Sequence, residues 1–266
     1  TVAHVVLDDL PWAEILTSDT CYTADNEPRA CDTGAPYTAG VLTTRAFMVS
    51  RVGRFNLTRA STLMGVFACR KYPMEDDLQP RIDRARLIEM FRADNAEEQA
   101  EERAKAGFGN GAECYTCHGQ FSLHAQPFVR FDKEGVWHQD ATGLQSEAET
   151  AQLGESDNGL FTSHLEDPAE AASERTQFFG KEVENLVGVA TELSASDAFG
   201  RCSVENVLGY VFNLDEGVSV APEVTEDALQ RARNRHYDFT FADLMVSTLS
   251  HPSVVFTTLD YFGDGT

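Results

Sequence analysis

Cys114-Tyr115-Thr116-Cys117-His118 lies near the middle of this 266-residue chain, and the expected fold class follows from it. Two cysteines stand three positions apart, and a histidine follows the second one directly. This C-x-x-C-H spacing is the attachment pattern of haem c. The two thiols add to the two haem vinyl groups, and the adjacent imidazole binds the iron as its proximal ligand. The pattern predicts a single covalent haem c held by Cys114, Cys117 and His118.

Three other interpretations of the motif are open. A thioredoxin-like dithiol follows a strand in a βαβ unit, whereas this motif follows a helical stretch and the loop Gly107-Phe108-Gly109-Asn110-Gly111. A zinc site needs a second pair of ligands, and the sequence has no second C-x-x-C and no H-x3-H. An ordinary disulfide is the third alternative. Haem attachment gives a role to every residue of the motif, and we adopt it.

The other four cysteines, Cys21, Cys31, Cys69 and Cys202, indicate the compartment. Their number is even, as an oxidising compartment favours. Cys21 and Cys31 bracket a short turn-rich loop that closes at low entropic cost, so we expect a bridge between them. Cys69 then pairs with Cys202 as a long-range link between two helices; the alternative is a pair of buried free thiols. Haem c is attached outside the cytoplasm, and we expect a periplasmic or secreted protein.

The composition excludes several classes of protein. Hydrophobic residues make up 42% of the chain, which excludes disorder over its whole length. Asp plus Glu number 43 against 21 Lys plus Arg, and the net charge of −22 repels nucleic acids and anionic membranes. No run approaches the roughly 20 apolar residues of a membrane span. The chain begins at Thr1 without a signal segment, which we interpret as a mature soluble chain after signal removal.

The apolar periodicity predicts a mainly α fold with long loops. Helices are expected over residues 11–16, 58–70, 81–106, 181–193, 198–214, 222–235 and 240–249. Thr225 and Thr240 are candidate caps. A cytochrome c-like helical haem domain is expected over 107–266, after an N-terminal helical and irregular extension over 1–106. The aromatic residues of 121–137 are expected to pack against a porphyrin or to form ordinary core.

Several segments resemble the planctomycete-type cytochrome c proteins. In that family the haem motif is followed by "FD-x-x-G-x-W" and then by a cysteine-bearing helix. The matching residues are Cys114–Gly119, Phe131–Trp137, Phe199, Cys202, Tyr210, Asn213, Phe241–Leu244 and Ser250, with Ala39–Thr43 and Arg59–Ser61 upstream. The family's "D/N-P-x-G-F" after the haem motif is replaced here by Ser122-Leu123-His124-Ala125-Gln126. The resemblance implies haem binding rather than any particular activity.

The sixth iron ligand of a low-spin electron carrier is Met or His. Met74 lies in a polar loop and Met245 lies on the last expected helix, so both are candidates. Met48, Met64 and Met90 are expected in the core. His138 is a further candidate, whereas His124 follows His118 too closely to reach the opposite haem face easily. His4, His236 and His251 are expected to be surface or capping groups, and an open distal position is the alternative.

These observations predict an extracytoplasmic monohaem c-type cytochrome that transfers single electrons. The acidic surface predicts a redox partner with a basic docking surface. The length beyond one haem domain suggests docking into a larger haem complex or a homo-oligomer. The alternatives are a peroxidase-like haem enzyme with an open distal site, in which His124, His138 or Glu113 would be the acid–base residue, and a structural subunit that carries one haem.

Overall fold

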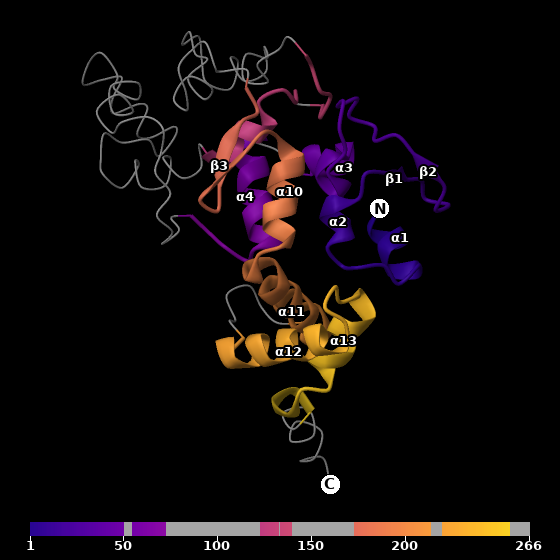
Figure 1. The fold of residues 1–266 in the computed structure, drawn as a ribbon, viewed down its shortest axis with the longest axis vertical. Coiled ribbons are helices and arrows are strands. Elements are labelled where there is room, and N and C mark those ends of the chain that lie inside the picture. The colour runs from indigo at the N-terminus through magenta and orange to yellow at the C-terminus, as the bar shows by residue number, and fades with distance from the viewer. Residues whose placement is uncertain (51–54, 73–122, 133, 140–172, 214–219, 256–266) are drawn as a thin grey trace, which may run out of the picture.

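The computed structural model describes residues 1–50, 55–72, 123–132, 134–139, 173–213 and 220–255. These residues form helices and two small antiparallel sheets, so the mainly α prediction is confirmed for them (Figure 1). The expected helix over 81–106 and the haem motif lie outside the described residues, as does the expected domain boundary between 106 and 107.

Short elements make up most of the N-terminal part. Its helices and strands are α1 (Val2–Leu7), α2 (Glu14–Thr17), β1 (Cys21–Tyr22), β2 (Pro28–Arg29), the 3-10 helix η1 (Gly40–Thr43), α3 (Arg45–Met48) and α4 (Phe55–Phe67). In the β1–β2 sheet Cys21 pairs with Arg29 and Tyr22 with Pro28. Helix α4 confirms the expected helix over 58–70, although it begins and ends three residues earlier.

Longer helices form the C-terminal part. The elements here are the 3-10 helix η2 (Gln126–Phe128), β3 (Thr176–Phe178), β4 (Lys181–Val183), α10 (Leu186–Ser194), α11 (Asp197–Phe212), α12 (Pro222–Arg235) and α13 (Phe241–Leu249). Helices α11, α12 and α13 pack against one another at one end of the molecule (Figure 1). The predicted helices 198–214, 222–235 and 240–249 are confirmed to within a few residues.

The helix predicted over 181–193 is wrong at its beginning. Lys181–Val183 is strand β4, which pairs with β3 through a turn at Phe179 and Gly180. Both turn residues have positive φ, 47° and 76°, which suits a two-residue hairpin whose twist matches its strands. The helix begins only after Asn185, whose side chain accepts a hydrogen bond from the Val187 amide. The apolar periodicity of the sequence did not reveal the hairpin, because the turn at Phe179 and Gly180 sets the backbone conformation of the residues that follow it.

The helix predicted over 11–16 also begins late, at Glu14. Residues Pro11 and Trp12 pair with the segment before α13: Pro11 bridges Thr240, and the Trp12 amide donates to the Phe239 carbonyl at 2.8 Å. This long-range pairing holds Pro11 extended. Thr240 caps α13 as expected, in a capping box with Asp243. Thr225 is not a cap: it lies buried within α12, and Ala221 precedes the helix.

The main apolar core contains residues from both of the expected domains. Leu16, Leu42, Met48, Leu63 and Met64 come from the expected extension. Phe128, Phe131, Phe178, Leu186 and Leu193 come from the expected haem domain, and all ten are fully or almost fully buried. The aromatic residues Phe128 and Phe131 are fully buried in this core. A second cluster joins α11, α12 and α13 through Val204, Leu208, Leu229 and Leu244.

Candidate functional site around His124

The structure brings the four cysteines outside the haem motif into two disulfides. Cys21 bonds to Cys31 with a Cα–Cα distance of 5.0 Å, and Cys69 bonds to Cys202 with a Cα–Cα distance of 5.1 Å. Both predicted pairings are confirmed. Since the chain has six cysteines, the two that take no part in these bonds are Cys114 and Cys117. Those two residues, together with His118 and Met74, lie outside the described residues.

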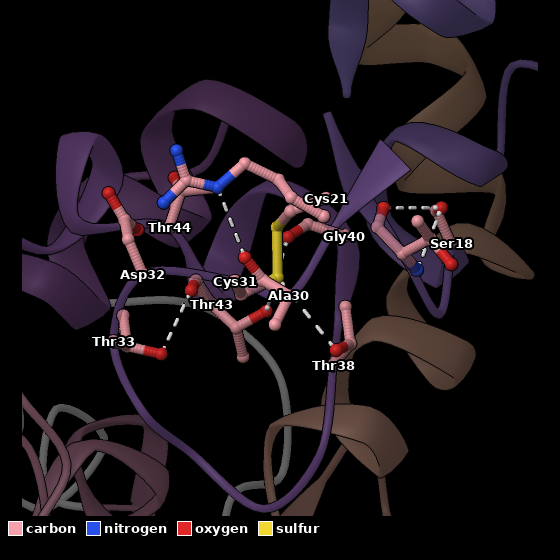
Figure 2. Close-up of a disulfide and its surroundings, with 12 residues drawn as sticks. Ser18, Cys21, Ala30, Cys31, Asp32, Thr33, Thr38, Gly40, Thr43 and Thr44 are labelled. Atoms are coloured by element: carbon pink, nitrogen blue, oxygen red, sulfur yellow. Dashed lines mark hydrogen bonds between the residues drawn. A yellow bond between two sulfur atoms is a disulfide. The ribbon is translucent and has the colours of Figure 1, made fainter. Parts of the chain in front are cut away.

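The Cys21–Cys31 disulfide supports the loop that follows it. Figure 2 shows the sulfur atoms among threonine hydroxyls: Thr43 donates to the Cys31 sulfur at 3.5 Å, and its hydroxyl accepts from the Ala39 amide at 3.0 Å. The Thr33 hydroxyl donates to the Thr43 carbonyl at 3.0 Å. The Thr33 carbonyl in turn accepts from the Trp137 amide at 2.8 Å. The disulfide loop is thus one support of the segment Phe131–Trp137.

Segment Phe131–Trp137 is a tight turn whose sequence pattern has a structural reason. The Asp132 carboxylate accepts a hydrogen bond from the Val136 amide at 2.8 Å and so closes the turn. Gly135 has a φ of +74°, and a Cβ at this position would lie 2.6 Å from the Met48 Cβ. A residue with a side chain would be strained by both the backbone angle and the contact. Asp132 and Gly135 of the Phe-Asp-x-x-Gly-x-Trp pattern therefore have a structural reason in this turn.

A buried arginine joins the same segment to α4. Arg59 is 3% exposed, and its guanidinium donates to the Met48 carbonyl at 3.0 Å and to the Phe131 carbonyl at 2.8 Å. It also donates to the Asp132 carbonyl and to Asn56 Oδ1. A buried guanidinium is stable only when its donors are used. We call these groups the Arg59 network. It connects two segments that are 72 residues apart in the sequence.

His124 lies where the segment that ends at Tyr72 meets the segment that begins at Leu123. The residue is 1% exposed, and its Nδ1 forms a hydrogen bond with the Tyr72 hydroxyl. The Phe178 ring packs on it with a centroid distance of 4.9 Å. The Thr176 hydroxyl donates to the Leu123 carbonyl at 2.6 Å and so fixes the backbone beside the histidine. We call His124, Tyr72 and Phe178 the His124 site.

No family model, curated protein or solved structure matches this chain.

The ring of His124 is neutral at physiological pH. Burial, and to a smaller extent the positive charge of Arg70, lower its pKa to about 3. Burial also raises the pKa of the Tyr72 hydroxyl well above its ordinary value, so Tyr72 keeps its proton. The guanidinium of Arg70 lies 5.4 Å from the centre of the Phe179 ring, beside the site. The site thus combines an uncharged imidazole with a nearby cation.

Nε2 of His124 has no hydrogen-bond partner among the residues that the structure describes, and it is shielded from solvent. A buried ring nitrogen without a partner destabilises a protein by about 1–3 kcal/mol. This Nε2 is one of seven buried polar side-chain atoms without a partner among the described residues, and each calls for an explanation. A group supplied by a ligand or cofactor would satisfy it.

A second pair of buried ionisable groups lies at Tyr37 and Glu174. The Tyr37 hydroxyl donates to Glu174 Oε1. Burial raises the pKa of Glu174 above its usual value, and the hydrogen bond from Tyr37 and the charge of Arg130 only partly oppose this rise. Burial and the neighbouring Glu174 together raise the pKa of Tyr37. The pair joins the loop after Cys31 to the segment before β3.

The remaining sequence candidates have structural roles in the described part of the chain. Met245 is half-buried against the second apolar cluster, on α13. His138 Nε2 lies 2.6 Å from the Asp132 carboxylate. His4 stacks on Tyr22, and the other two histidines contact aspartates, His236 with Asp243 and His251 with Asp227. The expected surface position is confirmed for His236, which is exposed. His4 is partly buried, and His251 is buried and accepts a hydrogen bond from the Ser253 amide at 3.2 Å.

Two features of the site had weak signals in the sequence. Arg59 occupies an apolar position of its helix, four residues before Leu63, and a charge on a buried stripe needs buried partners. His124 stands in the largely apolar stretch Phe121–Phe131. Neither signal identifies a partner. The described residues contain no cluster of three or more metal-binding side chains, and none of the described helices is long and apolar enough to cross a membrane.

Proposed function

We propose that this protein is an extracytoplasmic c-type cytochrome with one covalent haem, and that it transfers single electrons. The observation that carries the proposal is the pairing of the other four cysteines. Cys21, Cys31, Cys69 and Cys202 bond among themselves, so Cys114 and Cys117 are not needed as their partners. Two disulfides are compatible with an oxidising compartment, which is where haem c is attached. Cys114 and Cys117 would form the thioether bonds and His118 would bind the iron.

Chain connectivity supports a haem beside the His124 site. A chain extends at most about 3.5 Å per residue, so the six steps from His118 to His124 span at most about 20 Å. His124 is joined to Tyr72 by a hydrogen bond, and Met74 follows Tyr72 by two residues. Met74 and His118 are therefore each tied to this site by a short stretch of chain, although Met74 precedes the haem motif by 40 positions. This favours Met74 over Met245 as the sixth ligand.

The acidic composition supports a basic partner. With a net charge of −22, the chain would associate fastest with a positively charged redox protein, and the rate would fall as salt is added. The length of the chain supports docking into a larger haem assembly or a homo-oligomer. We also propose that the chain is related to the planctomycete-type cytochrome c proteins. The Arg59 network supports it because it joins two of the segments on which the resemblance rests.

Visible spectroscopy of the purified protein tests the function. We expect an alkaline pyridine haemochrome of the thioether type, and sharp bands of the reduced protein that carbon monoxide does not shift. A far-red sulfur-to-iron band that is lost in Met74→Leu and kept in Met245→Leu would establish the sixth ligand. Cys114→Ser with Cys117→Ser should abolish covalent haem. The matched control, Cys21→Ser with Cys31→Ser, removes a disulfide and should leave the haem attached.

The other outcomes have definite meanings. A high-spin spectrum that carbon monoxide shifts would replace the electron carrier with a haem enzyme. A haem that redox reagents neither reduce nor oxidise, together with a large particle in size-exclusion chromatography, would indicate the structural subunit. Mature protein that contains no haem would refute the proposal. Cys114 and Cys117 would then be candidates for a zinc site or a disulfide.

A further inference from the structure

The His124 site contains a buried polar atom for which the described residues supply no partner. Its Nε2 is shielded from solvent, while Nδ1 is held by the Tyr72 hydroxyl. Because Tyr72 is a protonated phenol, its hydroxyl can donate to Nδ1. A neutral imidazole that accepts at Nδ1 carries its proton on Nε2. The unpartnered atom is then a donor, and it needs an acceptor.

The surroundings favour a negatively charged acceptor. Arg70 contributes a positive charge close enough to depress the pKa of His124, and the same charge attracts an anion to the ring edge. Hydrogen bonds from a neutral N–H to a carboxylate are shorter and stronger than those to a neutral oxygen. The ring is also fixed before any ligand binds, since Tyr72 and Phe178 hold it from two sides. Little entropy is therefore lost on binding.

We propose that the Nε2–H of His124 is a buried donor for a carboxylate, and that this carboxylate is a propionate of the haem. The inference rests on the proposed function, because it needs haem within reach of residue 124. The two propionates of haem are anions, and burying an anion requires donors aimed at it. His124 supplies one donor, Arg70 supplies favourable charge, and Tyr72 is a positioning residue that fixes the ring.

Resonance Raman spectroscopy of the holoprotein tests the contact directly. The low-frequency propionate bending band responds to hydrogen bonding at the carboxylate. We expect it to shift in His124→Leu and to return toward its original frequency in His124→Gln, whose amide can donate from a similar position. The matched control is His251→Leu, which removes the ring of another buried histidine that contacts Asp227. It should leave the band unchanged.

A second measurement covers the case in which His124→Leu does not fold. In 15N-histidine-labelled wild-type protein, we expect a protected Nε2 proton that is absent in His124→Gln. Its exchange with solvent should become about tenfold faster in the haem-free Cys114→Ser and Cys117→Ser variant, because a charge-assisted hydrogen bond contributes at least 1.4 kcal/mol. Tyr72→Phe should weaken the protection as well, since the ring can then adopt either tautomer.

Failure of this inference is distinguishable from failure of the function. A thioether haemochrome together with an unchanged Raman band in His124→Leu would overturn the propionate contact and leave the cytochrome intact. Protection of the Nε2 proton that persists in the haem-free variant would overturn it too, by assigning the acceptor to the polypeptide. If acetate restores protection in the haem-free variant but the Raman band never moves, the site binds a free carboxylate and the haem propionate is excluded.

Discussion

The Arg59 network makes a quantitative prediction for Arg59→Met. The guanidinium donates to three backbone carbonyls and to one side-chain amide, and Arg59 is 3% exposed. Methionine fills a similar volume but leaves these acceptors without a donor. Each buried acceptor left without a donor costs about 1–3 kcal/mol, and the hydration that the arginine loses on folding offsets part of the sum, so we expect a net loss of about 3–5 kcal/mol. For a chain of this size we expect the melting temperature to fall by about 10 °C.

Urea unfolding followed by circular dichroism and tryptophan fluorescence measures this difference. Arg59→Lys keeps the charge but replaces the planar fork with a single ammonium, so it should recover less than half of the lost stability. The matched control is Arg201→Met, because Arg201 forms exposed ion pairs with Asp197 and Glu226 and should lose no more than about 1 kcal/mol. A loss for Arg59→Met no larger than that of Arg201→Met would refute the role that we assign to the network.

Three further predictions concern stability. Asp243→Asn should cost about 1–2 kcal/mol of stability at neutral pH. Desolvation raises the pKa of Asp243, but hydrogen bonds from Arg235, His236 and the Thr240 amide outweigh it and hold the pKa at about 2, below the usual 3.8. In thermal melts, the wild type should therefore lose its advantage over the variant as the pH falls from 4 through 2. Gly135→Ala should cost about 3 kcal/mol in urea titrations, against about 1 for Gly34→Ala, which has the same φ of +74° but open space around it; equal losses would contradict the contact with Met48. Cys69→Ser with Cys202→Ser should cost about 4 kcal/mol because their bond closes a loop of 133 residues, and non-reducing peptide mapping of wild type must first recover that pair.

The sequence by itself determined what depends on spacing along the chain. Helix α12 begins at a proline and α13 after a threonine cap, as their sequences predict, because these signals act within one turn of the helix. The Cys21–Cys31 bond was predictable since ten residues of turn-rich chain close easily. Cys69–Cys202 followed by elimination once the other cysteines had roles.

Tertiary structure alone decided the relations between distant segments. The hairpin at residues 176–183, the pairing of Pro11 with Thr240, and the partners of Arg59 and His124 depend on which segments pack together. The sequence marks His124 only as a histidine in an apolar stretch. Its burial, its hydrogen bond to Tyr72 and its unpartnered Nε2 arise from side chains that lie 50 or more positions away. Local propensity carries no information about such neighbours, because burial and electrostatic environment are properties of the folded core.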